Sequence, residues 1–257
     1  MHKNLRINSA KVEQKLVRFI RKQIAHTGLN RVLVGLSGGL DSSLVLYLCC
    51  QALGEENVFA LILPYKTTPA ESINSAKLIA RRLRVKTRFI DITPQVDAYF
   101  KNFPGADKVR RGNKMARERM SILYDRSKEL GALVAGTSNK TELLLGYATI
   151  YGDIACAFNP LGGLYKSQIR QLAGDVGLPN KIIQKTPSAG LWPGQSDEKE
   201  LGLTYARVDR LLYYLVDKKF SDKRLLGLGF KKSFLQKVKR RITDNAFKRQ
   251  LPPIARV

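Results

Sequence analysis

The chain has 257 residues, enough for one large domain or two small ones, and its 44% hydrophobic residues can bury a core. Its longest apolar runs, residues 32–36 and 58–63, are far shorter than the roughly 20 residues that cross a bilayer, and no apolar segment follows the start, so neither a membrane helix nor a signal peptide is predicted. The 45 Lys and Arg against 21 Asp and Glu give a net charge of +24, which either attracts polyanions and anionic substrates or belongs to an ordinary solvated surface.

Strand and helix patterns alternate through the first half of the chain. Apolar residues recur at helical spacing over residues 9–26, and Gly28 ends this predicted helix. The patterns that follow predict, in chain order, a strand 31–35, a helix 41–53, a strand 58–63, a helix 70–83, a strand 87–90, a helix 112–130 and a strand 132–135. This alternation is typical of an α/β fold: a doubly wound, mainly parallel sheet with helices on both faces.

The second half of the chain lacks strand patterns. Helical spacing predicts helices over residues 139–145, 167–176, 205–218 and 233–247, and the Pro-, Gly- and Ser-rich stretch 186–197 predicts a loop. No linker separates the two halves. We therefore expect residues 1–257 to form a single domain with an α-rich C-terminal portion.

The strongest motif lies directly after the first predicted strand, where it opens a helix. It consists of Gly35, Leu36, Ser37, Gly38, Gly39, Leu40, Asp41 and Ser42. Glycines let backbone N–H groups converge on an anion, and a helix N-terminus adds positive charge, so this turn predicts a phosphate-binding loop. It is not a Walker A loop, because no Gly-Lys-Ser/Thr follows. An Asp in such a loop suggests a Mg²⁺ ligand, or otherwise a helix cap.

The cysteines favour a reducing compartment, and hence the cytoplasm. Cys49 and Cys50 are neighbours and Cys156 stands alone, so no CxxC pair exists and neither a disulfide framework nor a zinc site is predicted. The three cysteines and two histidines form no Cys/His constellation. We therefore predict no catalytic side chain that acts as a covalent nucleophile.

The string from Ser37 to Ser42 resembles the N-type ATP pyrophosphatases, which cleave ATP to AMP and pyrophosphate. Further strings, in the same order, resemble the NAD synthetases of that superfamily: residues 112–120, 136–142, 146–153, 159–160, 187–189 and 195–202. The resemblance spans residues 9 to 255. It implies a ligase that adenylates the nicotinate carboxylate of deamido-NAD with ATP, after which ammonia displaces AMP.

The resemblance also implies roles for particular residues. Residues 35–42 would hold ATP together with Thr137, Lys166 and Ser188, whereas Asp41 and Glu142 would bind Mg²⁺. Contacts with deamido-NAD would come from Arg117, Asp153 and Lys248. The residues alone leave plainer readings open: Thr137 as a helix cap, Glu142 and Arg117 on solvated helix faces, Lys166 on the surface and Asp153 in an ordinary turn.

Topology gives an independent reason to join two of the motifs. Residues 136–138 follow the fourth predicted strand as the phosphate loop follows the first. In a doubly wound sheet of order 3-2-1-4 these strands are neighbours at the switch point, where ligands bind. The two motifs are therefore expected to face the same crevice.

Some positions depart from the family pattern. Ile150 and Ala157 stand where some members carry a Lys and an Asp that contact deamido-NAD, and Phe247 replaces a His before Lys248. A string that reads Thr/Ser-Ala-Asp-Leu in those members becomes Ser188-Ala-Gly190-Leu here. These changes concern the dinucleotide rather than activation of ATP.

Other functions remain open at this stage. A tRNA-modifying pyrophosphatase would explain the positive charge but often carries Cys pairs; a GMP synthetase-type domain or a nucleotide- or RNA-binding module are further alternatives. The resemblance implies a homodimer that uses deamido-NAD, ATP and ammonia, and neither nucleic acid nor a membrane is an expected partner.

Glutamine-dependent relatives add a large N-terminal nitrilase-like domain, for which about 30 residues before the first strand are too few. We therefore expect ammonium, not glutamine, to be the nitrogen source.

Overall fold

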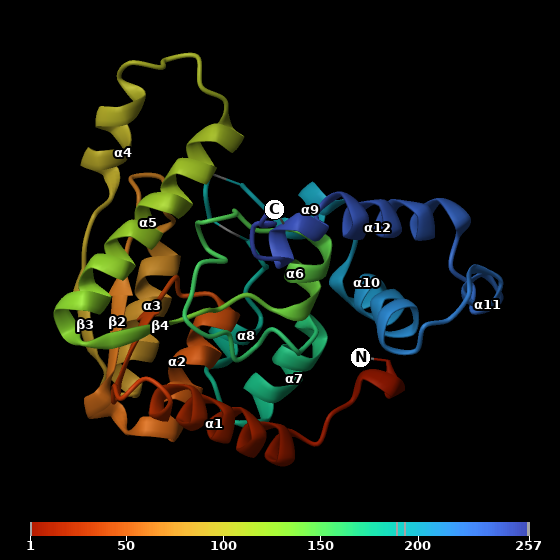
Figure 1. Cartoon of the computed structure of the whole chain (residues 1–257), viewed down its shortest axis with the longest axis horizontal. Helices are drawn as coiled ribbons and strands as arrows, with labels where there is room; N and C mark the ends of the chain where they lie inside the picture. The colour runs from red at the N-terminus through yellow and green to blue at the C-terminus, as the bar shows by residue number, and fades with distance from the viewer. Residues whose placement is uncertain (1, 189, 193, 256–257) are drawn as a thin grey trace.

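The structure, a computed structural model, describes residues 2–188, 190–192 and 194–255. A parallel four-stranded sheet forms its centre, with the strand order β3-β2-β1-β4 (Figure 1). The strands are β1 (Arg31–Gly35), β2 (Val58–Ile62), β3 (Lys86–Phe89) and β4 (Ala132–Ala135). The predicted order 3-2-1-4 is therefore confirmed, and β1 and β4 are neighbours.

Helices follow each strand and make up most of the second half of the chain. They are α1 (Ser9–Ala25), α2 (Leu40–Leu53), α3 (Ala70–Arg82), α4 (Thr93–Phe100), α5 (Lys108–Leu130), α6 (Lys140–Leu145), α7 (Lys166–Asp175), α8 (Asn180–Ile183), α9 (Asp197–Leu201), α10 (Tyr205–Leu212), α11 (Asp222–Gly227) and α12 (Lys232–Asp244). Short 3-10 turns are η1 (Lys3–Leu5), η2 (Glu55–Asn57) and η4 (Ala246–Arg249), and η3 (Tyr213–Asp217) is a π-helical turn. No helix of the described residues is long and apolar enough to span a membrane.

Both faces of the sheet are covered, because side chains alternate along each strand. Val32 and Val34 of β1 belong to a core shared with α1, α2, α3 and α7, whereas Leu33 packs with α4 and α5 on the other face. At the edge, β3 has the polar sequence Lys-Thr-Arg-Phe and is exposed throughout. The predicted α/β fold, with helices on both faces of a parallel sheet, is confirmed.

A further hydrophobic cluster joins the α-rich C-terminal portion to the rest. It contains residues of α6, α10, α11 and α12 together with Leu5 near the N-terminus and Tyr165 before α7. Figure 1 shows α10, α11 and α12 at the right, with α6 and α7 between them and the strands. This packing places the ends of α6 and α7 next to the loops that follow β1 and β4.

Several predicted boundaries were wrong, each for a local reason. Helix α5 begins at Lys108 rather than at residue 112, because the Asp107 side chain accepts a hydrogen bond from the Arg110 backbone N at 2.8 Å and caps the helix earlier. The predicted helix 205–218 changes to a π-helical turn at Tyr213. The predicted helix 233–247 is interrupted at Asn245.

Short helices were missed where patterns are too brief to show a period. These are α4, α8, α9 and α11. Within the predicted loop 186–197, residues 189 and 193 lie outside the described residues, and the described remainder is irregular until α9 begins at Asp197.

Candidate active site

The loop between β1 and α2 has the geometry of an anion-binding turn. Gly38 has φ 74°, and a Cβ there would lie 2.0 Å from the Ser72 carbonyl oxygen of α3, so only glycine fits. The hydroxyl oxygens of Ser37 and Ser42 lie 3.0 Å apart, and the Gly39 N–H donates to Ser37 Oγ at 3.2 Å. Gly39 caps α2 without any side-chain hydrogen bond. The first N–H groups of α2 are therefore free to bind an anion.

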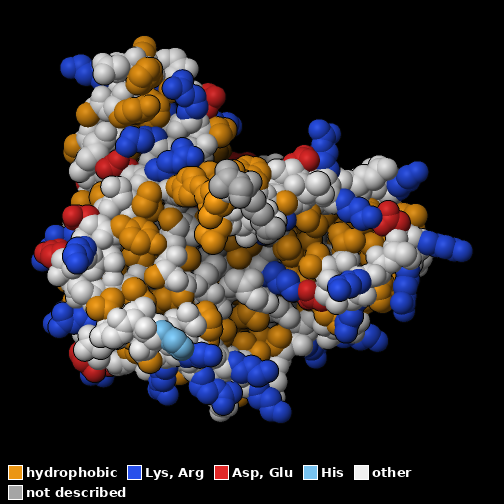
Figure 2. All heavy atoms as spheres, in the orientation of Figure 1, with side chains coloured by type: hydrophobic (Ala, Val, Ile, Leu, Met, Phe, Trp, Pro, Cys, Tyr) orange, Lys and Arg blue, Asp and Glu red, His pale blue; other side chains and the backbone are white. Residues whose placement is uncertain are grey.

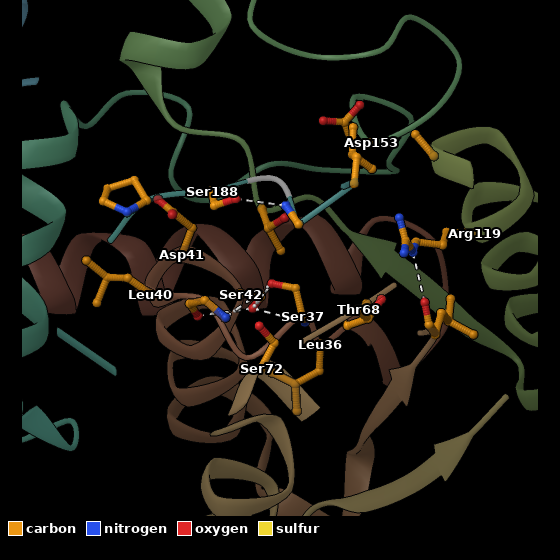
Figure 3. A pocket seen from close by; sticks show the side chains of 18 of the residues that line it. Leu36, Ser37, Leu40, Asp41, Ser42, Thr68, Ser72, Arg119, Asp153 and Ser188 are labelled. Carbon is orange, nitrogen blue, oxygen red and sulfur yellow. Dashed lines mark hydrogen bonds between the residues drawn. The ribbon is translucent and has the colours of Figure 1, made fainter. Parts of the chain in front are cut away.

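The loop opens into a cavity of about 420 Å³ at the carboxyl end of the sheet (Figure 3). In that view Asp41 and Ser188 lie on one side of the cavity, and Arg119 and Asp153 lie on the other. The predicted residues that line the cavity are Gly35, Leu36, Ser37, Gly39, Leu40, Asp41, Ser42, Thr137, Glu142, Asp153, Lys166 and Ser188. The motifs after β1 and β4 thus face one cavity, as the topology predicted.

Asp41 does not cap its helix. It forms an ion pair with Lys166 Nζ, and its other oxygen accepts a hydrogen bond from Asn139 Nδ2 at 3.1 Å. Lys166 Nζ also lies 3.6 Å from Glu142 Oε1. The segments after β1 and β4 therefore bring two carboxylates to one buried ammonium group, which lies at the start of α7.

Burial and charge act together on these groups. Burial and the nearby Asp41 carboxylate raise the pKa of Glu142 above its ordinary value, although Lys166 opposes the rise. Burial alone would lower the pKa of Lys166, but the carboxylates of Asp41 and Glu142 outweigh this effect and raise it. Lys166 is 5% exposed, so it is not the surface lysine that its sequence alone would suggest.

Glu142 is fixed by the start of α6 rather than lying on a solvated face. The Asn139 side chain accepts from the Glu142 N–H at 2.9 Å, and Glu142 Oε2 accepts from the Asn139 N–H at 3.2 Å. This reciprocal capping box leaves Oε1 facing Lys166. Asn139 also reaches Asp41, so one residue orients both carboxylates.

Around Lys166, carboxyl groups outnumber ammonium groups. Asp197, at the start of α9, also lines the cavity and is 4% exposed, and its Oδ1 has no hydrogen-bond partner among the described residues. Burial raises its pKa. Hard carboxylate oxygens in excess around one lysine suit a divalent cation. Among the described residues, no three Asp, Glu, His or Cys side chains form a group that could hold a metal by themselves.

Of the three residues predicted to contact deamido-NAD, one lines the cavity and two lie outside it. Asp153 lines the cavity, accepts from the Thr149 N–H at 2.6 Å, and has its pKa raised by burial. Arg117 is exposed outside the cavity and donates to the Ile150 carbonyl at 3.3 Å. Lys248 also lies outside the cavity and donates to the carbonyls of Gly146 and Ala148 at 2.8 and 2.9 Å. Gly38 shapes the loop without lining the cavity.

Sequence reasoning missed some lining residues. Arg119, rather than Arg117, points into the cavity, and its Nε donates to the Leu63 carbonyl at 2.8 Å. Burial lowers its pKa to about 10. Residues two apart on a helix point in different directions, so only the orientation of α5 could select between the two arginines. Lys185, which donates to Ser72 Oγ at 2.7 Å, gave no signal at all.

A parallel sheet with a glycine-rich loop at its switch point, opposite a buried lysine and two carboxylates, is an arrangement typical of phosphate-binding α/β proteins. The family model for NAD synthase matches residues 12–252. The chain therefore belongs to the NAD synthase family.

Similar proteins agree with this assignment. An NH3-dependent NAD(+) synthetase from Trichlorobacter lovleyi is 51% identical over 98% of this chain and 93% of its own length, and one from Fusobacterium nucleatum is 47% identical over 98% of both. Among solved structures, the NH3-dependent NAD synthetase of Campylobacter jejuni in complex with a nitrate ion has a TM-score of 0.83 and 38% identity, covering 98% of this chain and 100% of that one. The NMN synthetase of Francisella tularensis has a TM-score of 0.87 and 29% identity with the same coverage.

Proposed function

We propose that the chain is an ammonia-dependent NAD synthetase, a ligase that adenylates the nicotinate carboxylate of deamido-NAD and then amidates it with ammonia to give NAD, AMP and pyrophosphate. The observation that carries this proposal is the convergence of the phosphate loop with Asp41, Glu142 and Lys166 on one cavity. Relatives at 47% and 51% identity bear the same name.

ATP would bind with its triphosphate on the loop after β1. The free N–H groups at the start of α2 and the hydroxyls of Ser37 and Ser42 are donors of the right kind for phosphate oxygens. Thr137, Lys166 and Ser188 line the same cavity and would add further donors. Together with residues 35–42 they form our proposed ATP site.

Asp41 and Glu142 would hold Mg²⁺, since both are carboxylates on the edge of the phosphate site and Lys166 alone does not balance their charge. When bound, the ion would neutralise charge that develops on the phosphates. Lys166 would direct its positive charge at the same phosphate oxygens, and the loop amides would bind them without rearrangement.

The chemistry then needs no side-chain nucleophile. A carboxylate oxygen of deamido-NAD attacks the α-phosphorus of ATP, and the bond to pyrophosphate breaks. Ammonia attacks the acyl carbon of this mixed anhydride, and AMP leaves with the bridging oxygen while the nitrogen loses a proton. The protein contributes by binding both substrates in line and by stabilising charge on the leaving groups.

We place the nicotinate end of deamido-NAD near Asp153, on the cavity wall across from Asp41. Arg117 and Lys248 lie outside the cavity of one chain, so we propose that they contact the dinucleotide where two copies meet in a homodimer. Each has an exposed apolar side chain nearby. Tyr151 follows the residue whose carbonyl Arg117 binds, Phe247 precedes Lys248, and both are 57% exposed. We also propose that residues 1–257 form one domain and that the enzyme works in the cytoplasm.

A second candidate is amidation of nicotinate mononucleotide, since an NMN synthetase shares this fold with a TM-score of 0.87. Ile150, Ala157 and Phe247 also depart from the family positions that contact the dinucleotide. The two substrates share the nicotinate carboxylate and differ only in the adenylyl half.

The test is incubation with ATP, Mg²⁺ and ammonium, with deamido-NAD or nicotinate mononucleotide as acceptor. We expect NAD, AMP and pyrophosphate in equal amounts, a higher kcat/KM for deamido-NAD, and no product when glutamine replaces ammonium. A preference for nicotinate mononucleotide would move the assignment to the second candidate. Absence of an amide product with either acceptor, or turnover with XMP or tRNA instead, would overturn both.

A further inference from the structure

Asp209 is a fully buried carboxylate of α10 that no step of the proposed reaction uses. It is 0% exposed, and each of its oxygens accepts a hydrogen bond. Thr141 Oγ1 donates to Oδ1 at 2.6 Å, and the Ser167 backbone N–H donates to Oδ2 at 2.8 Å. Because a buried carboxylate is costly to desolvate, a fold that keeps one needs these partners in place.

The partners of Asp209 are the immediate neighbours of two residues in the cavity. Thr141 precedes Glu142 in α6, and Ser167 follows Lys166 in α7. Thr141 Oγ1 also accepts from the Lys166 backbone N–H at 3.1 Å. Asp209 and Thr141 together therefore bind the first two backbone N–H groups of α7, which no carbonyl within that helix can satisfy.

This junction joins elements that cannot hold their geometry alone. Helix α6 has only six residues, and isolated helices of that length are unstable in water. Its Glu142 carboxylate must lie 3.6 Å from Lys166 Nζ, although that lysine belongs to a different helix. A carboxylate at the N-terminus of α7 also interacts favourably with the helix dipole.

We infer that Asp209 is a positioning residue, which acts through Thr141 and Ser167 to set the separation of Glu142 and Lys166 at the phosphate site. The inference rests on the proposed function, because it treats those two side chains as the groups that act on ATP. It assigns no contact between Asp209 and substrate.

The sharpest test uses two substitutions of Thr141 that separate hydrogen bonding from packing. Thr141→Val keeps the shape but removes the hydroxyl, whereas Thr141→Ser keeps the hydroxyl but removes a methyl group. We expect Thr141→Val to lower kcat by at least about tenfold, since small displacements of catalytic groups are costly, and to leave the KM for ATP within about threefold. Thr141→Ser should stay within about threefold of the wild type in both.

A companion pair of variants tests the carboxylate itself. Asp209→Asn keeps the size but cannot accept both hydrogen bonds, and we expect the same loss of kcat with little change in ATP affinity measured by calorimetry. The matched control is Asp217→Asn. Asp217 accepts from Lys140 Nζ of α6 and from the Tyr165 hydroxyl before α7, so it ties the same two elements without touching their first backbone N–H groups. Its kcat should remain within about threefold of the wild type.

The outcomes separate the inference from the proposed function. A wild-type chain that forms no amide product refutes the proposed function before any variant is compared. If the wild type is active and Thr141→Ser is as impaired as Thr141→Val, the role is packing and the inference is wrong. If kcat is unchanged in Thr141→Val, the inference is also wrong, even where Asp209→Asn fails to fold.

Discussion

At the scale of single residues, the site depends on how a few charges are paired. Asp41 and Glu142 share Lys166, and Asn139 orients both carboxylates. Removing one member of a buried group of this kind leaves the others uncompensated. The consequences for activity and for stability are different, and they can be measured separately.

We predict that Asp41→Asn and Glu142→Gln each lower the rate of NAD formation by at least about a hundredfold, or about 2.7 kcal/mol of transition-state stabilisation. Both changes keep the side-chain shape and remove a negative charge that would hold Mg²⁺. If both carboxylates bind one ion, the rate of the double variant should fall by a factor much smaller than the product of the two single-variant factors. Steady-state kinetics at limiting Mg²⁺ measures this.

The matched control is Asp97→Asn. Asp97 also pairs with a lysine, Lys66, but does not line the cavity, so its rate should be close to that of the wild type. Near-wild-type rates for Asp41→Asn and Glu142→Gln would show that neither carboxylate binds the metal.

The raised pKa of Glu142 predicts how stability depends on pH. A carboxyl group whose pKa is higher in the folded state stabilises the fold fully below its ordinary value of 4.5, and this contribution is lost as pH rises towards the folded value. The wild type should therefore lose stability relative to Glu142→Gln between pH 5 and 8, by at least about 1 kcal/mol, the equivalent of roughly one pKa unit. Urea unfolding of both proteins measures the difference, and an unchanged difference across this range contradicts the shift.

The sequence predicted most of the residues that we find around the cavity, but not how they pair. A local string sufficed for the glycine-rich turn after β1, because its glycines and helix start act through neighbouring backbone. The ion pair between Asp41 and Lys166 joins residues 125 positions apart, and no pattern within either segment specifies it. Arg119 was missed for Arg117 because the choice depends on how α5 rotates against the sheet.

At the scale of elements, the short helix α6 is held at both ends. Asp209 accepts a hydrogen bond from Thr141 near its start, and Arg249 of η4 binds carbonyl groups near its end. Arg249 Nη1 donates to the carbonyls of Leu143 and Leu144 at 3.0 and 3.1 Å, and the Leu143 carbonyl also accepts from the Gly146 N–H at 3.3 Å. The C-terminal turn therefore supports the element that carries Glu142.

We predict that Arg249→Ala lowers the free energy of unfolding by about 1–3 kcal/mol, because it takes the Arg249 donor from the part-buried carbonyl groups at the end of α6. Arg240→Ala is the control: Arg240 pairs with Asp244 on α12 at 84% side-chain exposure, and its loss should change stability by less than about 0.5 kcal/mol. Chemical denaturation of the two variants decides the point. Equal stabilities would show that these capping contacts add nothing.

Helices with a long apolar pattern were predicted well, whereas several short helices were missed. The four strands of the described residues were all predicted; β1, β2 and β4 are apolar runs bounded by turns, whereas β3 is polar and was placed by the alternation of strand and helix. Helix α4 was missed because its eight residues, with Pro94 in the first turn, show too little period. The early start of α5 came from Asp107, a cap that the pattern of apolar residues does not report.

At the scale of the whole molecule, the chain carries a net charge of +24. Figure 2 shows Lys and Arg side chains mainly around the edges of the visible face, including a group near α1 at the lower edge, with fewer Asp and Glu among them. The long-range field of such a surface attracts anionic substrates, and both ATP and deamido-NAD are anions.

We predict that kcat/KM for both substrates falls a few-fold as ionic strength rises from about 0.05 to 0.3 M, while kcat changes little, because salt screens the approach and not the buried site. Kinetics with a chaotrope-free salt such as potassium acetate measures this. A constant kcat/KM would show that the surface charge does not assist capture of the nucleotides.

The most direct measurement of the proposed reaction is oxygen transfer from deamido-NAD labelled with ¹⁸O in its nicotinate carboxylate. If the carboxylate attacks the α-phosphorus of ATP and ammonia then displaces AMP, one labelled oxygen must pass to the phosphate of AMP while the other remains in the amide of NAD. Mass spectrometry of both products, with ammonium as the nitrogen source, should show this label in AMP in a one-to-one ratio with NAD. Unlabelled AMP formed alongside NAD would contradict activation of the carboxylate by adenylation.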